Sequence, residues 1–428
     1  MATEDILQDE IRVSHGLVYD KHSGELVGFT NLEETANDLC SLQENMQGGK
    51  KQKKLATSML VIMVRGTTST LRYPLACFPT TGVTSEFLYP IIWQAVKILE
   101  YRCKLKVLFI TCDGASANRR FFKLNKTADQ ECTYWCWNKY SFDKRKIFFV
   151  CDVPHLLKTT RNCFANSFYH KKTRMLWKNG RFISWRHVLN LYEDHVEGQV
   201  LSGPYKLKWS HVDLTAFSQM KVNLAAQVLS KTVADSLEQN YGPDVKETVT
   251  FIRHMNRYYD CLNVRNLKES AQKRNPDLRE YRTLDDERLQ YLTGGFLEYL
   301  QEWEDGVTNR DGFAKAEKGR MLLSHQTLSG LRISARSIVE IVQFLLREGA
   351  SFVLTHNFNQ DPLEEHFAHC RQKGGANNNP TVWDVQHCSS KLRVLGSSAL
   401  APIRGNITNR KRTMQADNTS LAKRAKKS

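Results

Sequence analysis

The chain has 428 residues, of which 41% are hydrophobic and 10% aromatic, so it is long enough for two or three domains with ordinary cores. It has no run of 18 apolar residues and opens on an acidic stretch, so we expect neither a transmembrane helix nor a secretory signal. The eleven irregularly spaced cysteines indicate reduced intracellular thiols. The net charge is +16, and residues 404–428 supply +7 of it through eight Lys or Arg and one Asp. The remaining +9 favours a partner with a phosphate backbone.

Residues 1–165 have the pattern of an α/β unit. Alternation in LQDEIRVSHGLVYD predicts a strand followed by a second one, with a turn at residues 22–24. The runs KVLFITCDG and KIFFVCDVPH are nearly continuous and apolar, which is typical of buried central strands. Further strands are predicted at 60–66 and 73–78, and a helix over 85–101.

Helical periodicity dominates after residue 165. MKVNLAAQVLSKTVADSL and the segment 285–303 each predict a helix, and no strand run is apparent in this part. SARSIVEIVQFLLREGA predicts a helix that Gly349 ends, and DPLEEHFAHCRQ predicts another that begins at Asp361 and Pro362. We therefore predict an α/β domain built from residues 1–165 and 321–395, interrupted by an all-α insertion at 166–320 and followed by a disordered basic tail at 396–428.

Three acidic residues are placed where two-metal chemistry needs carboxylates. Asp9 lies within the first predicted strand, Asp113 ends the buried run KVLFITCD, and Glu364 lies in the first turn of a helix far downstream. Carboxylates from several elements can hold a pair of Mg²⁺ or Mn²⁺ ions for phosphoryl transfer. Spacing alone leaves the alternative open that these acids only end strands, cap helices or face solvent.

Five long strings in the chain resemble P-element-type DNA transposases, including the vertebrate THAP-domain relatives. They occur in family order over roughly residues 8–385, and they are DEIRVSHGLVYDKHSGELVGF, CDGASANRRFF, CDVPHLLKTTRNCF, QTLSGLRISARS and FVLTHNFNQDPLEEHFAHCRQKGGANNNPT. The resemblance implies an RNase H-like catalytic domain that is interrupted by a helical insertion which binds GTP. It also implies that the chain cleaves and joins DNA strands.

The resemblance maps the family's catalytic, metal-binding carboxylates onto Asp9, Asp113 and Glu364, with Mg²⁺ or Mn²⁺ as cofactor. Asp152, in the string DVPH, is the main rival for the second position, but it also suits the cap of the helix that starts at Pro154. That helix carries Lys158 and Arg161, for which contact with DNA phosphate and a solvent-facing position both stay open.

Guanine nucleotide binding is likewise implied by the resemblance. The chain has no GxxxxGK[ST] loop, so a P-loop is excluded. The family's nucleotide-binding positions fall on Lys221, Val222, Asp260, Asn263 and Asp361. A carboxylate can accept the guanine N1–H and N2–H₂, whereas Lys can meet phosphate or carbonyl oxygen. By pattern alone each of these residues suits a structural role, and Val222 lies on an apolar face.

Basic segments bear on partners and location. The run YHKKTRMLWKNGRFISWRH interleaves Trp177 and Trp185 with cations, which suits nucleic-acid stacking or, alternatively, a helix that packs its Trp residues inward. Lys411-Arg412 and KRAKK suit a bipartite nuclear import signal. We therefore expect a nuclear protein with DNA, as transposon ends and target, for a partner, and leave a homo-oligomer open.

The sequence departs from the family at its start. The zinc module and the coiled coil that begin full-length relatives are absent from it, and residues 41–56 look like an extra loop. This leaves a second interpretation, a catalytically inactive or domesticated transposase fragment that acts as a nuclear DNA-binding or regulatory protein.

Overall fold

The computed structural model describes residues 3–21, 24–31, 54–67, 69–126, 133–199, 206–373 and 379–396. The predicted extra loop at 41–56 falls outside these ranges except for its last three residues. The predicted disordered tail also falls outside them after residue 396, as do both clusters of the predicted import signal.

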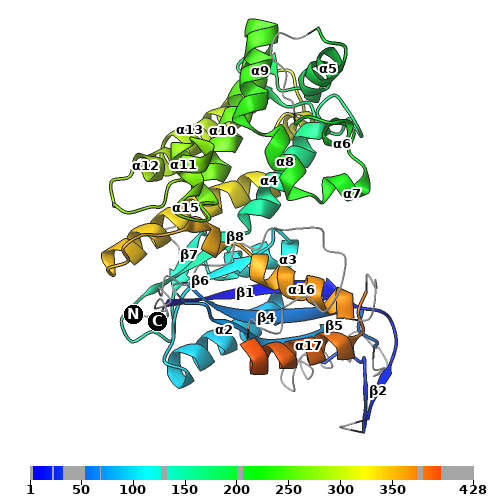
Figure 1. The fold of residues 1–428 in the computed structure, drawn as a ribbon, viewed down its shortest axis with the longest axis vertical. Coiled ribbons are helices and arrows are strands. Elements are labelled where there is room, and N and C mark those ends of the chain that lie inside the picture. Colours follow the sequence, from blue (N-terminus) through cyan, green and yellow to red (C-terminus); the bar gives the residue numbers. More distant parts are fainter. Residues whose placement is uncertain are drawn as a thin grey trace, which may run out of the picture.

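A six-stranded mixed sheet forms the lower part of the molecule (Figure 1), with strand order β5-β4-β1-β6-β8-β7. Its strands are β1 (Thr3–Arg12), β4 (Ser58–Gly66), β5 (Arg72–Thr80), β6 (Lys106–Cys112), β7 (Trp135–Trp137) and β8 (Lys146–Cys151). β1 pairs antiparallel with β4 but parallel with β6, which in turn pairs parallel with β8. The neighbours β1, β6 and β8 therefore all end at the same edge of the sheet. A hairpin of β2 (Val18–Asp20) and β3 (Glu25–Val27) follows β1.

The sheet separates two hydrophobic cores, because alternate residues of a strand point to opposite faces. Ile6 of β1 belongs to the core that includes α2 (Ser85–Lys97) and α3 (Ser116–Leu124). Leu7 and Ile11 belong to the core on the other face, which α16 (Asp361–Lys373) and α17 (Val382–Leu395) complete. α16 therefore lies across the sheet face at β1 even though it follows β1 by some 350 residues in sequence.

The helical part stands above the sheet in Figure 1 and lies between α4 (Val153–Ala165) and α15 (His325–Arg347). α15 packs along β8, where Ser334 Oγ donates to the carbonyl of Cys151 at 2.7 Å. The helices between them are α5 (Trp185–Val196), α6 (Trp209–Val212), α7 (Ala216–Gln219), α8 (Val222–Val228), α9 (Lys231–Tyr241), α10 (Lys246–Leu262), α11 (Glu269–Lys273), α12 (Glu287–Thr293), α13 (Gly295–Thr308) and α14 (Lys315–Arg320).

The structure corrects three local predictions in the helical part. The single helix predicted over 220–237 is divided into α8 and α9, because Ser230 Oγ accepts a hydrogen bond from the backbone N–H of Val233 and caps α9. The predicted helix at 285–303 divides at Gly294, between α12 and α13. A short hairpin, β9 (Trp177–Lys178) and β10 (Arg181–Phe182), forms where no strand was predicted. Its two turn residues both have positive φ, as tight hairpin turns require.

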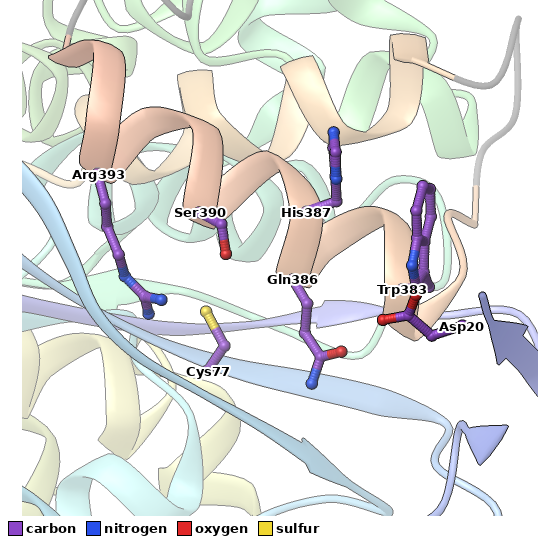
Figure 2. A pocket seen from close by; sticks show the side chains of 7 residues that line it. All are labelled: Asp20, Cys77, Trp383, Gln386, His387, Ser390 and Arg393. Carbon is purple, nitrogen blue, oxygen red and sulfur yellow. The ribbon is translucent and has the colours of Figure 1, made fainter. Parts of the chain in front are cut away.

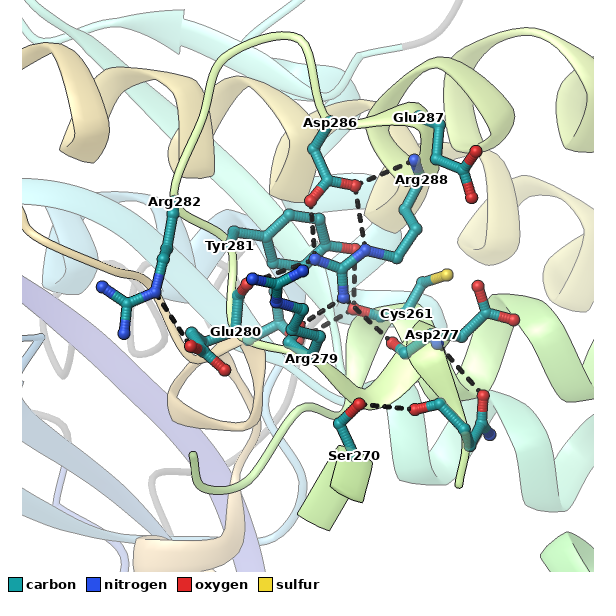
Figure 3. A network of polar contacts seen from close by, with 12 residues as sticks. Cys261, Ser270, Asp277, Arg279, Glu280, Tyr281, Arg282, Asp286, Glu287 and Arg288 are labelled. Carbon is teal, nitrogen blue, oxygen red and sulfur yellow. Dashed lines mark hydrogen bonds and ion pairs between the residues drawn. The ribbon is translucent and has the colours of Figure 1, made fainter. Parts of the chain in front are cut away.

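Arg288 organises the loop that precedes α12 (Figure 3). Its guanidinium is buried, pairs with Asp286 at 2.6 Å and lies 3.9 Å from the centroid of the Tyr281 ring. It also donates to the backbone carbonyls of Asp277, Arg279 and Glu280. Tyr281 in turn pairs by its backbone with Val353. Because the Tyr281 hydroxyl also donates to the carbonyl of Cys261 at 3.0 Å, the loop ties the C-terminal end of α10 to the segment that leads into α16.

Glu4, at the start of β1, is only 2% exposed, and its burial and then the charge of Asp5 raise its pKa to about 7. A raised carboxyl pKa gives stability that is present at pH 4 and is lost as the pH rises towards 7. We therefore expect Glu4→Gln to raise the free energy of unfolding by about 2 kcal/mol at pH 8 and to leave it unchanged at pH 4. Urea unfolding at both pH values checks this. Glu298→Gln, on an exposed face of α13, should show no such pH-dependent gain, and an equal gain in both variants would contradict the account.

Candidate active site

Three acidic residues lie at the carboxyl ends of three adjacent parallel strands. Asp9 lies in β1, Asp113 directly follows β6 and Asp152 directly follows β8. The register pairs Gln8 with Cys112 and Cys112 with Cys151, so the three acids occupy neighbouring positions across the sheet. Adjacent strands are about 4.8 Å apart, so these carboxylates converge at one edge, where parallel strands commonly present ligand-binding residues.

Asp9 is the electrostatic centre of this cluster. Burial raises its pKa well above the usual range, and the charges of Asp113, Glu364 and Asp152 raise it further. One of its oxygens, Oδ1, accepts the backbone N–H of Glu10 at 2.7 Å. The fold therefore brings the first and second predicted catalytic acids together and places Glu364, from the first turn of α16, within their electrostatic range.

Asp113 is oriented by the start of α3. Its Oδ1 accepts hydrogen bonds from the backbone N–H of Ala115 at 2.8 Å and from Asn118 Nδ2 at 2.7 Å. Asn118 is itself buried and accepts from Gln8 Nε2 at 3.1 Å. Sequence reasoning missed both Asn118 and Gln8, although the string CDGASAN places a polar residue five positions after the acid.

Asp152, the rival for the second position, has both oxygens engaged by the backbone. Its Oδ1 accepts the N–H of Gln360 at 3.0 Å, and its Oδ2 accepts the N–H of His155 at 2.9 Å. Burial raises its pKa to about 6 in spite of these two bonds. Gln360 also donates from Nε2 to the carbonyl of Gln8 at 2.7 Å. Asp152 thus caps α4, as predicted, and fixes the segment from which α16 begins.

The carboxylates Asp9, Asp113 and Glu364 suit a divalent cation in their chemistry and in their electrostatics. Their oxygens are the hard ligands that Mg²⁺ and Mn²⁺ prefer. Within the described ranges no ion pair with Lys or Arg involves any of the three, so no direct ion pair offsets their mutual repulsion. The same ranges contain no group of three or more His, Cys, Asp or Glu side chains already arranged as a metal site.

Two of the predicted nucleotide-binding residues lie on either side of one histidine. Asn263, at the end of α10, contacts His356 Nδ1 through its Oδ1 at 3.1 Å, and His356 Nε2 lies 3.4 Å from Asp361 Oδ2. Burial lowers the pKa of His356 to about 4. Asp260 lies one turn earlier on α10, where its Oδ2 accepts from Asn256 and Asn275, both at 2.8 Å. His356 was not predicted, because only the tertiary fold brings it between these residues.

The other two predicted nucleotide-binding residues lie on a different part of the insertion. Lys221 is exposed, and its Nζ lies 4.1 Å from the centroid of the Phe217 ring. Val222 begins α8 and packs at the edge of the main core. α8 packs on α4 and α6, whereas α10 packs on α9 and α4.

Arg161 and Trp185, which were candidates for contact with DNA, are both buried in the protein interior. Arg161 is fully buried, and its Nη2 donates to the carbonyls of Ser218 and Gln219 at 3.0 and 3.1 Å, so neither predicted alternative for it is correct. Trp185 is also fully buried, and its Nε1 donates to the carbonyl of Val212 at 3.0 Å. For Trp185 the inward-packing alternative is correct.

A cavity of about 390 Å³ lies between α17 and β5 (Figure 2). It is lined by Asp20 and Cys77 and by side chains of α17 that include Trp383, Gln386 and Arg393. None of the four clustered acids lines it, so it adds nothing to the candidate active site.

Comparisons with known proteins agree with this architecture. Three family models match: "TNP-like, RNase H N-terminal domain" at residues 4–126, "TNP-like, GTP-binding insertion domain" at 154–275 and "TNP-like, RNase H C-terminal domain" at 356–386. The Drosophila melanogaster "Transposable element P transposase" is 26% identical over 251 residues, which cover 56% of this chain and 29% of that protein. The solved structure of the "Drosophila P element transposase strand transfer complex" is similar, with a TM-score of 0.67 at 19% identity, and the match covers 93% of this chain and 78% of that one. The fold is therefore RNase H-like, interrupted by a helical insertion.

Proposed function

The chain belongs to the P-element-type transposases, and from this premise we propose that it is a DNA transposase core that cleaves and joins DNA strands. The observation that carries the proposal is the convergence of Asp9, Asp113 and Glu364 at one edge of an RNase H-like sheet, with no direct ion pair to Lys or Arg among the described residues. The reaction is a phosphoryl transfer, in which a hydroxyl oxygen attacks a phosphodiester and the bond to the leaving oxygen breaks.

Each residue of the cluster has a distinct part in this proposal. Asp9, Asp113 and Glu364 would hold Mg²⁺ or Mn²⁺, and such ions, when bound, activate the attacking hydroxyl and stabilise the leaving oxygen. Asn118 holds the Asp113 carboxylate in place. Asp152, through Gln360, holds the start of α16 against the ends of β1 and β8 and so positions Glu364.

A strand-cleavage assay tests the proposal. The purified chain is incubated with Mn²⁺ and with branched or transposon-end DNA, and nicked and joined products are separated on a denaturing gel. Metal-dependent products support the transposase core. Stoichiometric DNA binding with no product in Mn²⁺ would instead support the second interpretation, a nuclear DNA-binding or regulatory protein without catalysis.

We further propose that the insertion binds a guanine nucleotide through residues around the end of α10. The matching insertion-domain model and the Asn263–His356–Asp361 arrangement support this. Buried polar groups arranged to bind one base reject a base that leaves them unpaired. Lys221 and Val222 belong to the same proposal, although they lie on the α8 side.

Titration with GTP and ATP should show tighter binding of GTP, and Asn263→Ala should weaken GTP binding at least about tenfold, which corresponds to one or two lost hydrogen bonds. Asp260→Ala should do the same. Gln301→Ala, on an exposed face of α13, is the control and should leave GTP binding unchanged. Equal affinity of the wild-type chain for GTP and ATP would end this proposal.

DNA as the partner and the nucleus as the site of action follow from the proposed activity, and assembly into a homo-oligomer belongs to the same proposal. Among the described residues no helix is long and apolar enough to cross a membrane.

A further inference from the structure

A second cavity, of about 280 Å³, opens directly beside the carboxylate cluster. It is lined by Gly114, which follows Asp113, by Arg119 of α3, by the face of α4 that begins at His155, and by Ser324 and Thr327 at the start of α15. Three elements that are distant in sequence therefore line one space next to the proposed catalytic residues. Most of the lining comes from the strings that resemble the family, but none of the predicted catalytic or nucleotide-binding residues lines it.

Arg119 is the main cation of this cavity. Its Nε donates to the carbonyl of Gly114 at 2.8 Å, and its buried Nη1 has no acceptor among the described residues. The guanidinium lies in a slot between two glycines, since a Cβ on Gly330 would come within 3.0 Å of Nη2 and one on Gly114 within 3.1 Å. A guanidinium that is held in place without a carboxylate partner can still donate a charge-assisted hydrogen bond to an anion.

Lys158, one turn after His155 on α4, adds positive charge near the cavity. Burial and the charges of Lys158 and Arg119 lower the pKa of His155, whereas the charge of Asp113 raises it, so His155 lies within electrostatic range of all three groups. Within the described ranges neither Lys158 nor Arg119 forms an ion pair with an acidic residue. The Arg119 cavity is therefore positively charged, and it lies beside the negatively charged carboxylates of the candidate active site.

This juxtaposition fits a DNA strand better than it fits a separate small anion. A scissile phosphodiester at the carboxylates would carry its neighbouring phosphate into the adjoining space, and phosphate contacts from Arg fix the position of a strand. We propose that the Arg119 cavity binds the phosphate next to the scissile phosphodiester, with His155 as a second polar contact. This inference rests on the proposed strand-cleaving function of the same site.

A methylphosphonate scan tests the proposal without requiring catalysis. Branched DNA is made with a single neutral methylphosphonate at each successive position around the junction, and binding is measured by fluorescence anisotropy in Ca²⁺. For the wild-type chain, one position should weaken binding about tenfold or more, as the loss of a charge-assisted hydrogen bond predicts. In Arg119→Met that position should lose its effect, while the other positions keep theirs.

The neighbouring arginine supplies a matched control. Arg120 is exposed on the same helix and pairs with Glu86 at 2.8 Å, so Arg120→Met should leave the position-specific effect intact. Arg119→Lys is the fallback variant if Arg119→Met folds poorly. It keeps the charge but loses the guanidinium, so the position-specific effect should become smaller without disappearing. The proposal would be overturned if no methylphosphonate position had a selectively reduced effect on binding in Arg119→Met or in Arg119→Lys.

Two further outcomes distinguish this inference from the proposed nucleotide binding and from the proposed catalysis. If Arg119→Met leaves the scan unchanged but weakens GTP binding, the cavity binds nucleotide phosphate and the proposal is wrong. If the wild-type chain cleaves no DNA in Mn²⁺ but the selective loss in Arg119→Met is seen, the strand-binding proposal holds while the proposed catalysis fails.

Discussion

Asp9→Asn, Asp113→Asn and Glu364→Gln should each lower the rate of Mn²⁺-dependent DNA strand cleavage by about a thousandfold or more. Each amide keeps the shape of its parent side chain but removes one negative charge from the set that is proposed to hold the metal. Metal ions contribute several kcal/mol of transition-state stabilisation, and each 1.4 kcal/mol corresponds to a factor of ten in rate. Single-turnover cleavage of transposon-end DNA, with product quantified over time, measures the effect.

Glu365 provides the matched control for Glu364. It is the next residue on α16, but its carboxylate pairs with Arg72 at 2.7 Å instead of facing Asp9. Glu365→Gln should therefore keep a rate within a few-fold of the wild type. Retained cleavage in Asp9→Asn or Asp113→Asn, with DNA binding unchanged, would show that the catalytic residues are assigned wrongly.

The largest effect on stability is expected from Asp152→Ala. The substitution leaves two backbone N–H groups, those of His155 and Gln360, without their acceptor, and an unsatisfied buried donor costs about 1–3 kcal/mol. Removing a buried charge offsets part of this loss. We expect the free energy of unfolding to fall by about 2–4 kcal/mol, measured by urea denaturation at pH 7 in the absence of metal.

The same variant separates the two rivals for the second metal-binding position. Asp152→Ala should still be stabilised against heat by Mn²⁺, because both Asp152 oxygens already serve the backbone, whereas the hydrogen bonds that Asp113 accepts from Ala115 and Asn118 both fall on its Oδ1. Asp113→Asn should lose most of that Mn²⁺-dependent rise in melting temperature. The opposite pattern would assign the second position to Asp152.

The parts of the fold that were predicted correctly from the sequence are those determined by residues next to one another in the chain. The runs KVLFITC and KIFFVC form β6 and β8, because a strand that is covered on both faces must be apolar throughout. Asp113 and Asp152 are the first residues after those runs, so the sequence alone predicts that they lie at the ends of the two strands. Gly349 ends α15 with a φ of 94°, a conformation that favours glycine.

The parts that sequence did not predict depend on tertiary contacts. Arg161 looks like a surface cation in sequence, but the carbonyls at the end of α7 make a buried position tolerable for it. His356 is separated by more than 90 residues from Asn263, so no local pattern joins them. The role of Asn118 is visible only once β1 and β6 are paired, because its amide links Gln8 of one strand to the acid that ends the other.

Anomalous X-ray scattering from crystals of the chain soaked in Mn²⁺ is the sharpest test of whether Asp9, Asp113 and Glu364 together hold the catalytic metal. We expect at least one anomalous peak in contact with the carboxylates of Asp9 and Asp113, with Glu364 turned towards it, and no such peak in Asp9→Asn. A peak bound to Asp152 without Asp113, or no peak at this edge of the sheet at saturating Mn²⁺, would contradict this assignment.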